Sequence, residues 1–249
     1  MAEQGPLERL VYAALGWLMA HSVRKTLLAR ELTFEDGRSG RWLKPDIKRY
    51  VKATKLKANE IRRIKAARPD DFGNRVMVEM TVRTIAAYRA LLEMGVERVC
   101  ARRLVADIIW DIYSKMLGLY SWPFRLTTRD PSKRISRTIK ALLWFPFQAT
   151  GAPGYAVEHW DADGNTYTHF THCPPHSFVR ALIATGADQG DLIAFRESWC
   201  RYDWPGADIL AGDGSRGHYE RRQTLSHGDK VCDMCWRGRV EDNETAKHG

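Results

Sequence analysis

Residues 155–172 read YAVEHWDADGNTYTHFTH, and this stretch decides the fold class. Apolar and polar residues alternate over 155–160 and again over 166–172, as they do in strands with one buried face. The five residues between them include Gly164, which can adopt the positive φ of a tight turn. We therefore predict a β-hairpin.

The residues after this hairpin predict two helices and a second hairpin. Helical spacing returns over residues 177–185 and 188–202, with glycines between them. Alternation returns over residues 218–225 and 230–237, on either side of a short polar turn. Two hairpins separated by two helices are typical of an antiparallel sheet with helices packed on one face, so we predict an α+β fold.

The first half of the chain predicts helices. Residues 8–34, 74–95 and 97–118 carry apolar residues at three-to-four spacing, and a glycine ends each of the last two ranges. A densely basic stretch over 44–68 would place charge around most of a helix. Because no nucleic-acid motif accompanies it, we interpret this stretch as a solvated face and do not expect nucleic acid as a partner.

Charge divides the chain into the same two parts. Residues 1–150 contain 29 Lys and Arg against 15 Asp and Glu, whereas the remaining residues are net acidic. We predict a basic, mainly helical region over 1–150, an α+β domain over 151–240 and a polar tail over 241–249. The helical half is expected to pack against the antiparallel sheet of the second half.

Composition excludes several classes of protein. The 249 residues are 44% hydrophobic and 28% charged, which is inconsistent with a disordered or fibrous chain. Five cysteines are too few, and odd in number, for a secreted disulfide framework. We expect reduced thiols and a cytoplasmic location.

Two apolar stretches raise the question of a membrane. Residues 10–20 follow acidic residues and are too short to span a bilayer, so they predict an amphipathic core helix, with an interfacial anchor as the alternative. In residues 133–147, basic residues precede an apolar run that Pro146 interrupts. This second stretch predicts at most a peripheral membrane contact.

Residue types suited to catalysis or metal binding gather in the second half, which holds four of the five cysteines and most of the histidines. Cys173 stands where a strand gives way to a helix, and Cys200 and Asp203 are expected to share a helix face. Cys232 and Cys235 form a CxxC pair, but a simple strand points residues three apart to opposite faces and cannot present both to one ion. For any one cysteine, the alternative is a small buried apolar side chain.

The block RQTLSHGDKVCD at residues 222–233 carries a more specific pattern, R-x-T-x-x-x-G-x-x-x-C-D. It resembles the signature of the L-2-amino-thiazoline-4-carboxylic acid hydrolase family. Cys173-Pro174 and Cys200-x-x-Asp203 also fall where that family places its other cysteines and its aspartate. The likeness covers about residues 74–240 and is most specific in the last twenty. Three features depart from the family pattern. The family often has a basic residue such as Arg at the position of His172, Cys235 is an additional thiol, and the basic first seventy residues have no counterpart.

The resemblance implies hydrolytic opening of a 2-amino-thiazoline ring to N-carbamoyl-cysteine. The ring carbon between sulfur and nitrogen is electrophilic, and either a cysteine thiolate or a metal-activated water adds to it. The catalytic candidates are Cys200, Asp203, Cys232, Cys173 and His172. The cofactor is none or a divalent metal, which Cys173, Cys200 and Cys232 would hold together with a histidine.

The substrate-binding candidates are Arg222, Thr224 and His169. The Arg222 guanidinium can bind a carboxylate with two parallel hydrogen bonds, and a cross-strand ion pair is the alternative role. These inferences describe a hydrolase of a small heterocyclic or amidine-like carboxylate. The alternative is a non-catalytic small-molecule or metal-binding sensor module.

Overall fold

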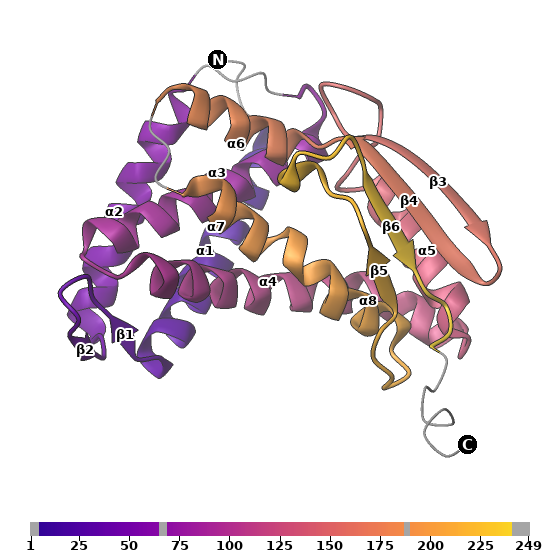
Figure 1. Cartoon of the computed structure of the whole chain (residues 1–249), viewed down its shortest axis with the longest axis horizontal. Helices are drawn as coiled ribbons and strands as arrows, with labels where there is room; N and C mark the ends of the chain where they lie inside the picture. Colours follow the sequence, from indigo (N-terminus) through magenta and orange to yellow (C-terminus); the bar gives the residue numbers. More distant parts are fainter. Residues whose placement is uncertain (1–4, 65–68, 187–189, 241–249) are drawn as a thin grey trace.

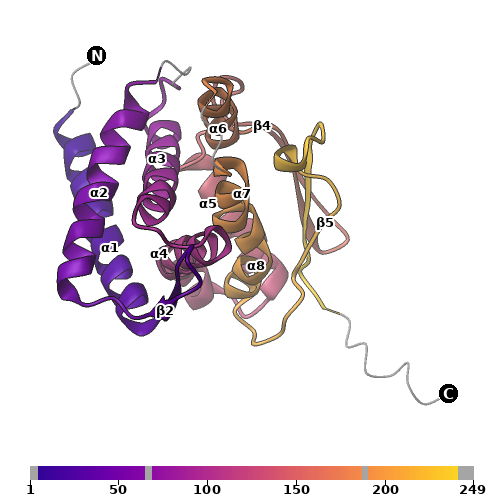
Figure 2. The same cartoon turned by 60° about the vertical axis from the view of Figure 1, so that its left-hand side comes forward.

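The computed structural model describes residues 5–64, 69–186 and 190–240, so the predicted polar tail lies outside the described residues. A group of helices stands at one end of the molecule and a four-stranded antiparallel sheet at the other, with further helices between them (Figure 1). Figure 2 shows α6, α7 and α8 between the N-terminal helices and the sheet. The predicted α+β fold is confirmed.

The helical half contains the predicted helices and forms a helix from the basic stretch, but it also contains a short ribbon and a fifth helix that were not predicted. Its elements are α1 (Pro6–Ala29), β1 (Leu32–Thr33), β2 (Ser39–Gly40), α2 (Lys44–Arg62), α3 (Phe72–Glu93), α4 (Arg98–Thr127) and α5 (Pro131–Trp144). Gly95 has a φ of 77° in the short connection after α3, and the Glu97 side chain then caps α4 by accepting from the backbone N–H groups of Val99 and Cys100. Helix α1 is shorter than predicted, because the chain after Ala29 turns into the ribbon β1–β2.

The second half contains the sheet and the helices that cover it. Its elements are β3 (Ala156–Ala162), β4 (Asn165–His172), α6 (Pro174–Ala184), α7 (Asp191–Ser198), the 3₁₀ turn η1 (Cys200–Tyr202), α8 (Asp203–Ala211), β5 (Tyr219–Arg221), the 3₁₀ turn η2 (Leu225–His227) and β6 (Cys232–Trp236). The strand order is β3-β4-β6-β5, and every neighbouring pair is antiparallel.

The first predicted hairpin is confirmed and is tighter than expected. Strands β3 and β4 pair up to Ala162 and Asn165, which leaves a two-residue turn. Asp163 and Gly164 have φ angles of 51° and 75°, and two successive positive φ angles are what a type I′ turn requires.

The second predicted hairpin forms, but its first strand is shorter than predicted. β5 contains only Tyr219–Arg221, because residues 225–227 form the turn η2. The Asp233 carboxylate accepts hydrogen bonds from the backbone N–H groups of Arg222 and Gln223, and this takes the chain out of the strand. In the sheet, β6 lies between β4 and β5.

The prediction that Cys200 and Asp203 share one helix is wrong. Helix α7 ends at Ser198, Cys200 lies in η1, and Asp203 is the first residue of a separate helix, α8. Pro205 explains the break, because its ring would clash with a preceding helical turn but is accommodated in the first turn of a new helix.

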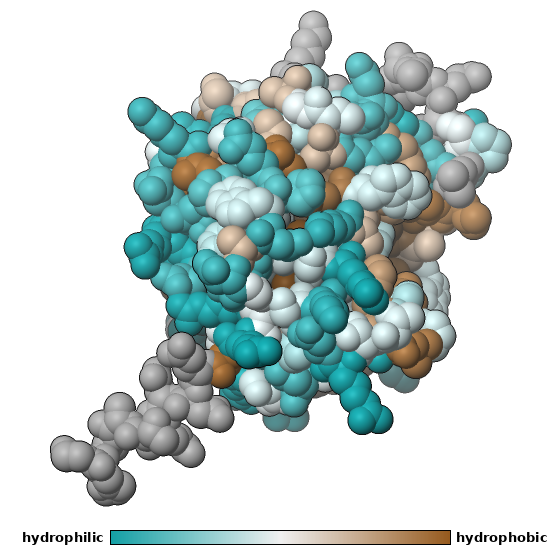
Figure 3. Space-filling view, turned by 90° about the vertical axis from the view of Figure 1, so that its right-hand side faces the viewer, coloured by the Kyte–Doolittle hydropathy of each residue, from teal (hydrophilic) through white to brown (hydrophobic). Residues whose placement is uncertain are grey.

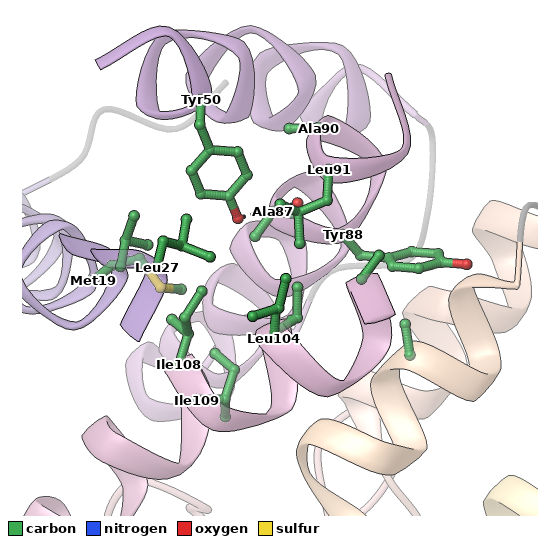
Figure 4. Close-up of a cluster of buried hydrophobic side chains, with 14 of the residues drawn as sticks. Met19, Leu27, Tyr50, Ala87, Tyr88, Ala90, Leu91, Leu104, Ile108 and Ile109 are labelled. Atoms are coloured by element: carbon green, nitrogen blue, oxygen red, sulfur yellow. Dashed lines mark hydrogen bonds between the residues drawn. The ribbon is translucent and has the colours of Figure 1, made fainter. Parts of the chain in front are cut away.

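Buried apolar side chains join the elements. In one cluster, Tyr50 of α2 points toward α3 and donates a hydrogen bond to the Ala87 carbonyl at 3.1 Å, close to Leu104 and Ile108 of α4 (Figure 4). A second cluster combines α4, α5, α8 and the inner face of the sheet. Because this second cluster draws on residues from both sides of position 150, α5 and the sheet share a core.

The two apolar stretches considered as membrane contacts both contribute to the core. Leu15 and Met19 of α1 are buried, as are Ile139, Leu142 and Leu143 of α5. Within the described residues, no helix is long and apolar enough to cross a membrane. Helix α1 also leaves the large apolar side chains of Leu10 and Trp17 exposed.

Candidate functional site

A cavity of about 260 Å³ lies between the helical half and the inner face of the sheet. Apolar side chains make up most of its wall, and they come from α1, α3, α4, α5 and the sheet. The polar or ionisable side chains that line it include Tyr113, Tyr155, Cys173, Cys200, Asp203, Arg221 and Cys232. A mostly apolar cavity with a few convergent polar groups is the usual form of a small-molecule site.

An ion pair between Asp203 and Arg221 is the only pairing of opposite charges in this wall, among the described residues. The Arg221 Nη1 donates to the Asp203 Oδ2 at 2.9 Å, and its Nη2 donates to the Cys200 carbonyl at the same distance. The guanidinium also lies over the Trp204 ring at 4.7 Å. These contacts connect β5 to η1 and α8 and hold the guanidinium in place.

Burial sets the charge state of Asp203. Desolvation raises the pKa of this carboxyl to about 6, and the Arg221 charge and the Tyr219 and Tyr113 hydroxyls oppose the rise by stabilising the carboxylate. The Tyr219 hydroxyl donates to Oδ2 at 3.3 Å. Near neutral pH the group is therefore mostly ionised, but it gains a proton within the range in which general bases operate.

The three cavity thiols are neutral near pH 7. Burial raises the pKa of Cys200 to about 12, and the Asp203 charge adds to the rise. Burial likewise raises the pKa of Cys173 and Cys232. None of the three is in a disulfide. A thiolate therefore forms here only as its proton is transferred to a base.

The Cys232 thiol has two hydrogen-bond partners: Leu225, the first residue of η2, and Thr224, the residue before η2. Its sulfur accepts from the Leu225 backbone N–H at 3.3 Å and lies 3.3 Å from the Thr224 Oγ1. Both contacts lower the pKa of Cys232 against the larger effect of burial. Thr224, predicted to bind substrate, is thus placed behind Cys232 and does not line the cavity.

Four of the predicted catalytic residues meet at this cavity. Cys173, Cys200, Asp203 and Cys232 span 60 positions of the sequence and all line its wall. The CxxC interpretation also agrees with the strand geometry, because Cys232 faces the cavity while Cys235 pairs with Tyr167 on the other face of the sheet.

Arg222 does not reach the cavity. Its side chain is 82% exposed and its Nε donates to Glu220 at 3.2 Å, so it forms an ion pair along its own chain segment. The neighbouring Arg221, only 5% exposed, occupies the position at the cavity that was predicted for Arg222. The alternation of side chains along β5 could have identified Arg221 as the inward-facing arginine, since Arg221 shares a strand face with the apolar Tyr219 and Arg222 does not.

The two histidines of the prediction also lie outside the cavity wall. The His172 Nδ1 is 2.6 Å from the Gly154 carbonyl and its Nε2 is 2.9 Å from the Ser177 Oγ, so the ring connects the end of β4 to α6. His169 lies on the outer face of β4, with its ring against Trp160 at 4.7 Å. Neither ring is placed to exchange a proton with a molecule in the cavity.

Two tyrosines of the wall were not identified from the sequence. Tyr113 of α4 forms a hydrogen bond with Asp203, and Tyr155 forms one with Cys173. Their sequence context gives no distinctive signal, because an aromatic residue at helical or strand spacing is the usual component of a core. Tertiary packing brings the hydroxyls to the site, because α4 packs against α8, and Tyr155, just before β3, lies in a core cluster with residues of α8.

Cys173, Cys200 and Cys232 are also the predicted metal ligands. They share the cavity wall, but the described residues contain no group of three or more His, Cys, Asp and Glu placed to hold a metal ion. Comparisons with known proteins find no matching family model, no matching curated protein and no matching solved structure.

Proposed function

We propose that the protein is a cytoplasmic hydrolase that opens a small heterocyclic, 2-amino-thiazoline-like or amidine-like carboxylate. One observation carries the proposal. The three cysteines and the aspartate that the resemblance to L-2-amino-thiazoline-4-carboxylic acid hydrolases implicates come from three distant segments of the sequence and line one cavity. Three separate segments, around positions 173, 200–203 and 232, have to fold together to bring these side chains to one cavity.

The charges of the wall fit such a substrate. The Asp203 carboxylate complements an amidinium group, and the Arg221 guanidinium complements a carboxylate. Both are anchored by neighbours before any ligand arrives, since Arg221 also contacts the Cys200 carbonyl and the Trp204 ring. A site whose charged groups are already oriented loses little conformational entropy on binding.

The thiol chemistry follows from the charge states. As the Cys200 sulfur adds to the ring carbon between sulfur and nitrogen, Asp203 accepts the thiol proton. The bond from that carbon to the ring sulfur breaks, and the departing sulfur takes a proton to become a free thiol. Water then adds to the resulting isothiourea, the bond to Cys200 breaks, and an N-carbamoyl product leaves with the Cys200 thiol restored.

A non-catalytic binding module is the second candidate, and a specific observation favours it. All three cavity thiols are neutral and their pKa values are raised, whereas resting nucleophilic cysteines have lowered pKa values. An apolar cavity with an oriented ion pair can bind a ligand without converting it. The two candidates differ in turnover, which an assay measures directly.

The test is release of a free thiol from L-2-amino-thiazoline-4-carboxylate, followed with a thiol reagent and corrected for the protein's five cysteines. We expect multiple turnovers from the wild type, none from Cys200→Ser, and wild-type turnover from Cys235→Ser, because Cys235 does not line the cavity. Full activity in Cys200→Ser would rule out Cys200 as the nucleophile. Saturable binding with no turnover in the wild type would identify a binding module.

The neighbouring arginines provide a matched pair for the same assay. Arg221→Lys replaces the two-pronged guanidinium at the cavity with a single ammonium, so we expect the KM to rise about tenfold or more. Arg222→Lys changes an exposed side chain and should leave the KM within about twofold. A higher KM in the Arg222 variant alone would restore Arg222 as the carboxylate ligand.

A further inference from the structure

The C-terminal half of α4 exposes a row of large apolar side chains. Leu119, Trp122 and Leu126 are 71%, 59% and 69% exposed. They follow one another at three-to-four spacing, so they lie on one face of the helix. A continuous row of this kind differs from the scattered single apolar residues that are ordinary on a protein surface.

This row continues a face of α4 that is buried further up the helix. Ile108 and Ile112 belong to the same helical row and lie in the core cluster that α4 shares with α1. There the two helices are in contact, as shown by the Ser22 hydroxyl of α1 donating to the Ile108 carbonyl at 2.8 Å. Beyond Ile112 the same face is no longer covered.

Helix α1 exposes a similar row at its N-terminal end. Leu10 and Trp17, which are one heptad apart, are each 67% exposed. Ala14, between them on the same face, is also exposed. On the opposite side of this helix, Val11 and Leu15 line the cavity, as Met116 and Tyr120 of α4 do. We call the exposed side chains Leu10, Ala14, Trp17, Leu119, Trp122 and Leu126 the apolar rows.

The segments that carry the apolar rows are cationic. Residues 9–28 and 112–129 together contain six Lys and Arg and no Asp or Glu. Asp111, at the edge of the second segment, pairs with Lys25 and Lys115. In the described part of the chain, no carboxylate pairs with Arg24, Arg125 or Arg129, so a net positive charge accompanies the rows.

We propose that the apolar rows of α1 and α4 dock the protein on an anionic membrane surface. Leucine and tryptophan side chains enter the boundary between headgroups and acyl chains, while arginines near them attract anionic lipids. A second copy of the chain is a poorer occupant, because two cationic faces repel each other. The sheet end of the molecule does not offer this combination, since its surface is mostly hydrophilic (Figure 3).

Vesicle sedimentation of the full chain tests the proposal. The probes are vesicles of phosphatidylcholine alone and vesicles in which about one lipid in three is phosphatidylglycerol. We expect the wild type to partition into the anionic vesicles about tenfold more strongly, and this preference to weaken as salt is added. Equal partitioning into both vesicles, or into neither, would overturn the proposal.

Matched double variants identify the surface. Leu119→Ser with Trp122→Ser removes the centre of the α4 row, and we expect binding to anionic vesicles to fall about tenfold or more. Leu56→Ser with Trp160→Ser removes exposed side chains of the same kinds from α2 and β3, and binding should not change. Far-UV circular dichroism confirms that both variants are folded.

Two further results would count against the proposal. An equal loss of binding in the control variant would show that the apolar rows are not the contact. A dimer in light scattering that the α4 variant converts to a monomer would show that a second copy covers this face. Neither result bears on turnover of the heterocycle, so the docking surface and the proposed hydrolase stand or fail separately.

Discussion

At the scale of single residues, the site depends on which side chain of a strand faces inward. Arg221 and Arg222 are adjacent and chemically identical, yet one is held against Asp203 in the cavity wall and the other pairs with Glu220 in solvent. The same alternation separates Cys232 from Cys235. A single position along β5 or β6 therefore decides whether a group can take part in chemistry.

The charge state of Asp203 gives a prediction for pH. Because burial raises the pKa of this carboxyl to about 6, its proton-accepting form is lost as the pH falls through 6 and is present above it. We expect kcat/KM for the heterocycle to rise toward a plateau between about pH 5 and pH 7. Rates measured from pH 4.5 to 8.5 check this. A profile that falls over this range would assign Asp203 the role of a proton donor.

The same shift has a consequence for stability. The pKa of Asp203 in the folded protein is above its ordinary value, so folding favours the protonated carboxyl. This contribution to the free energy of unfolding is present in full below the ordinary pKa of an aspartate, and it is lost as the pH rises through about 6.

At the scale of elements, the turn between β3 and β4 has the most specific local requirement. The backbone at Gly164 has a φ of 75°, and the nearest atom that a Cβ would meet is the Ser132 Oγ at 3.9 Å. A side chain there would therefore fit sterically but force an unfavourable backbone conformation. The cost of substitution at this position comes from the backbone and not from packing.

Two glycine substitutions test this requirement with opposite signs. Gly164→Ala should lower the free energy of unfolding by about 1 kcal/mol, because alanine disfavours positive φ. Gly118 lies inside α4, and no atom is within 4 Å of the Cβ that alanine would add there. Because alanine favours the helix over glycine, Gly118→Ala should raise the free energy of unfolding by about 0.5–1 kcal/mol. Urea unfolding measures both. Equal effects of the same sign would contradict the assignment of the turn.

At the scale of the whole molecule, a buried ion pair joins the two halves of the chain. The Arg89 guanidinium of α3 binds the Asp191 carboxylate at the start of α7 through two contacts, with Nε to Oδ1 at 3.1 Å. The Asp191 side chain has no exposed surface. The carboxylate also lies at a helix N-terminus, where the helix dipole favours negative charge.

Removing one partner of this pair should destabilise the fold. We expect Asp191→Leu to lower the free energy of unfolding by about 3–5 kcal/mol, because it removes the buried carboxylate that Arg89 binds through two contacts. The double variant Arg89→Met with Asp191→Leu should recover most of the loss. Chemical unfolding of the three proteins gives the comparison. An additive double variant would show that the two residues act independently.

The sequence by itself determined the α+β class, three helices of the first half and the hairpin at residues 155–172. These depend on hydrophobic period and turn chemistry, which act between residues a few positions apart. The break after Ser198 also had a local signal in Pro205, although the helical spacing of the surrounding residues concealed it.

Only the tertiary structure decided the site and the exposed surface. The cavity gathers Cys173 from the residue before α6, Cys200 from η1 and Cys232 from β6, which the strand order places between β4 and β5. The apolar rows are exposed because α1 covers only part of α4. Contacts between segments far apart in the chain arise from packing, which local patterns do not encode.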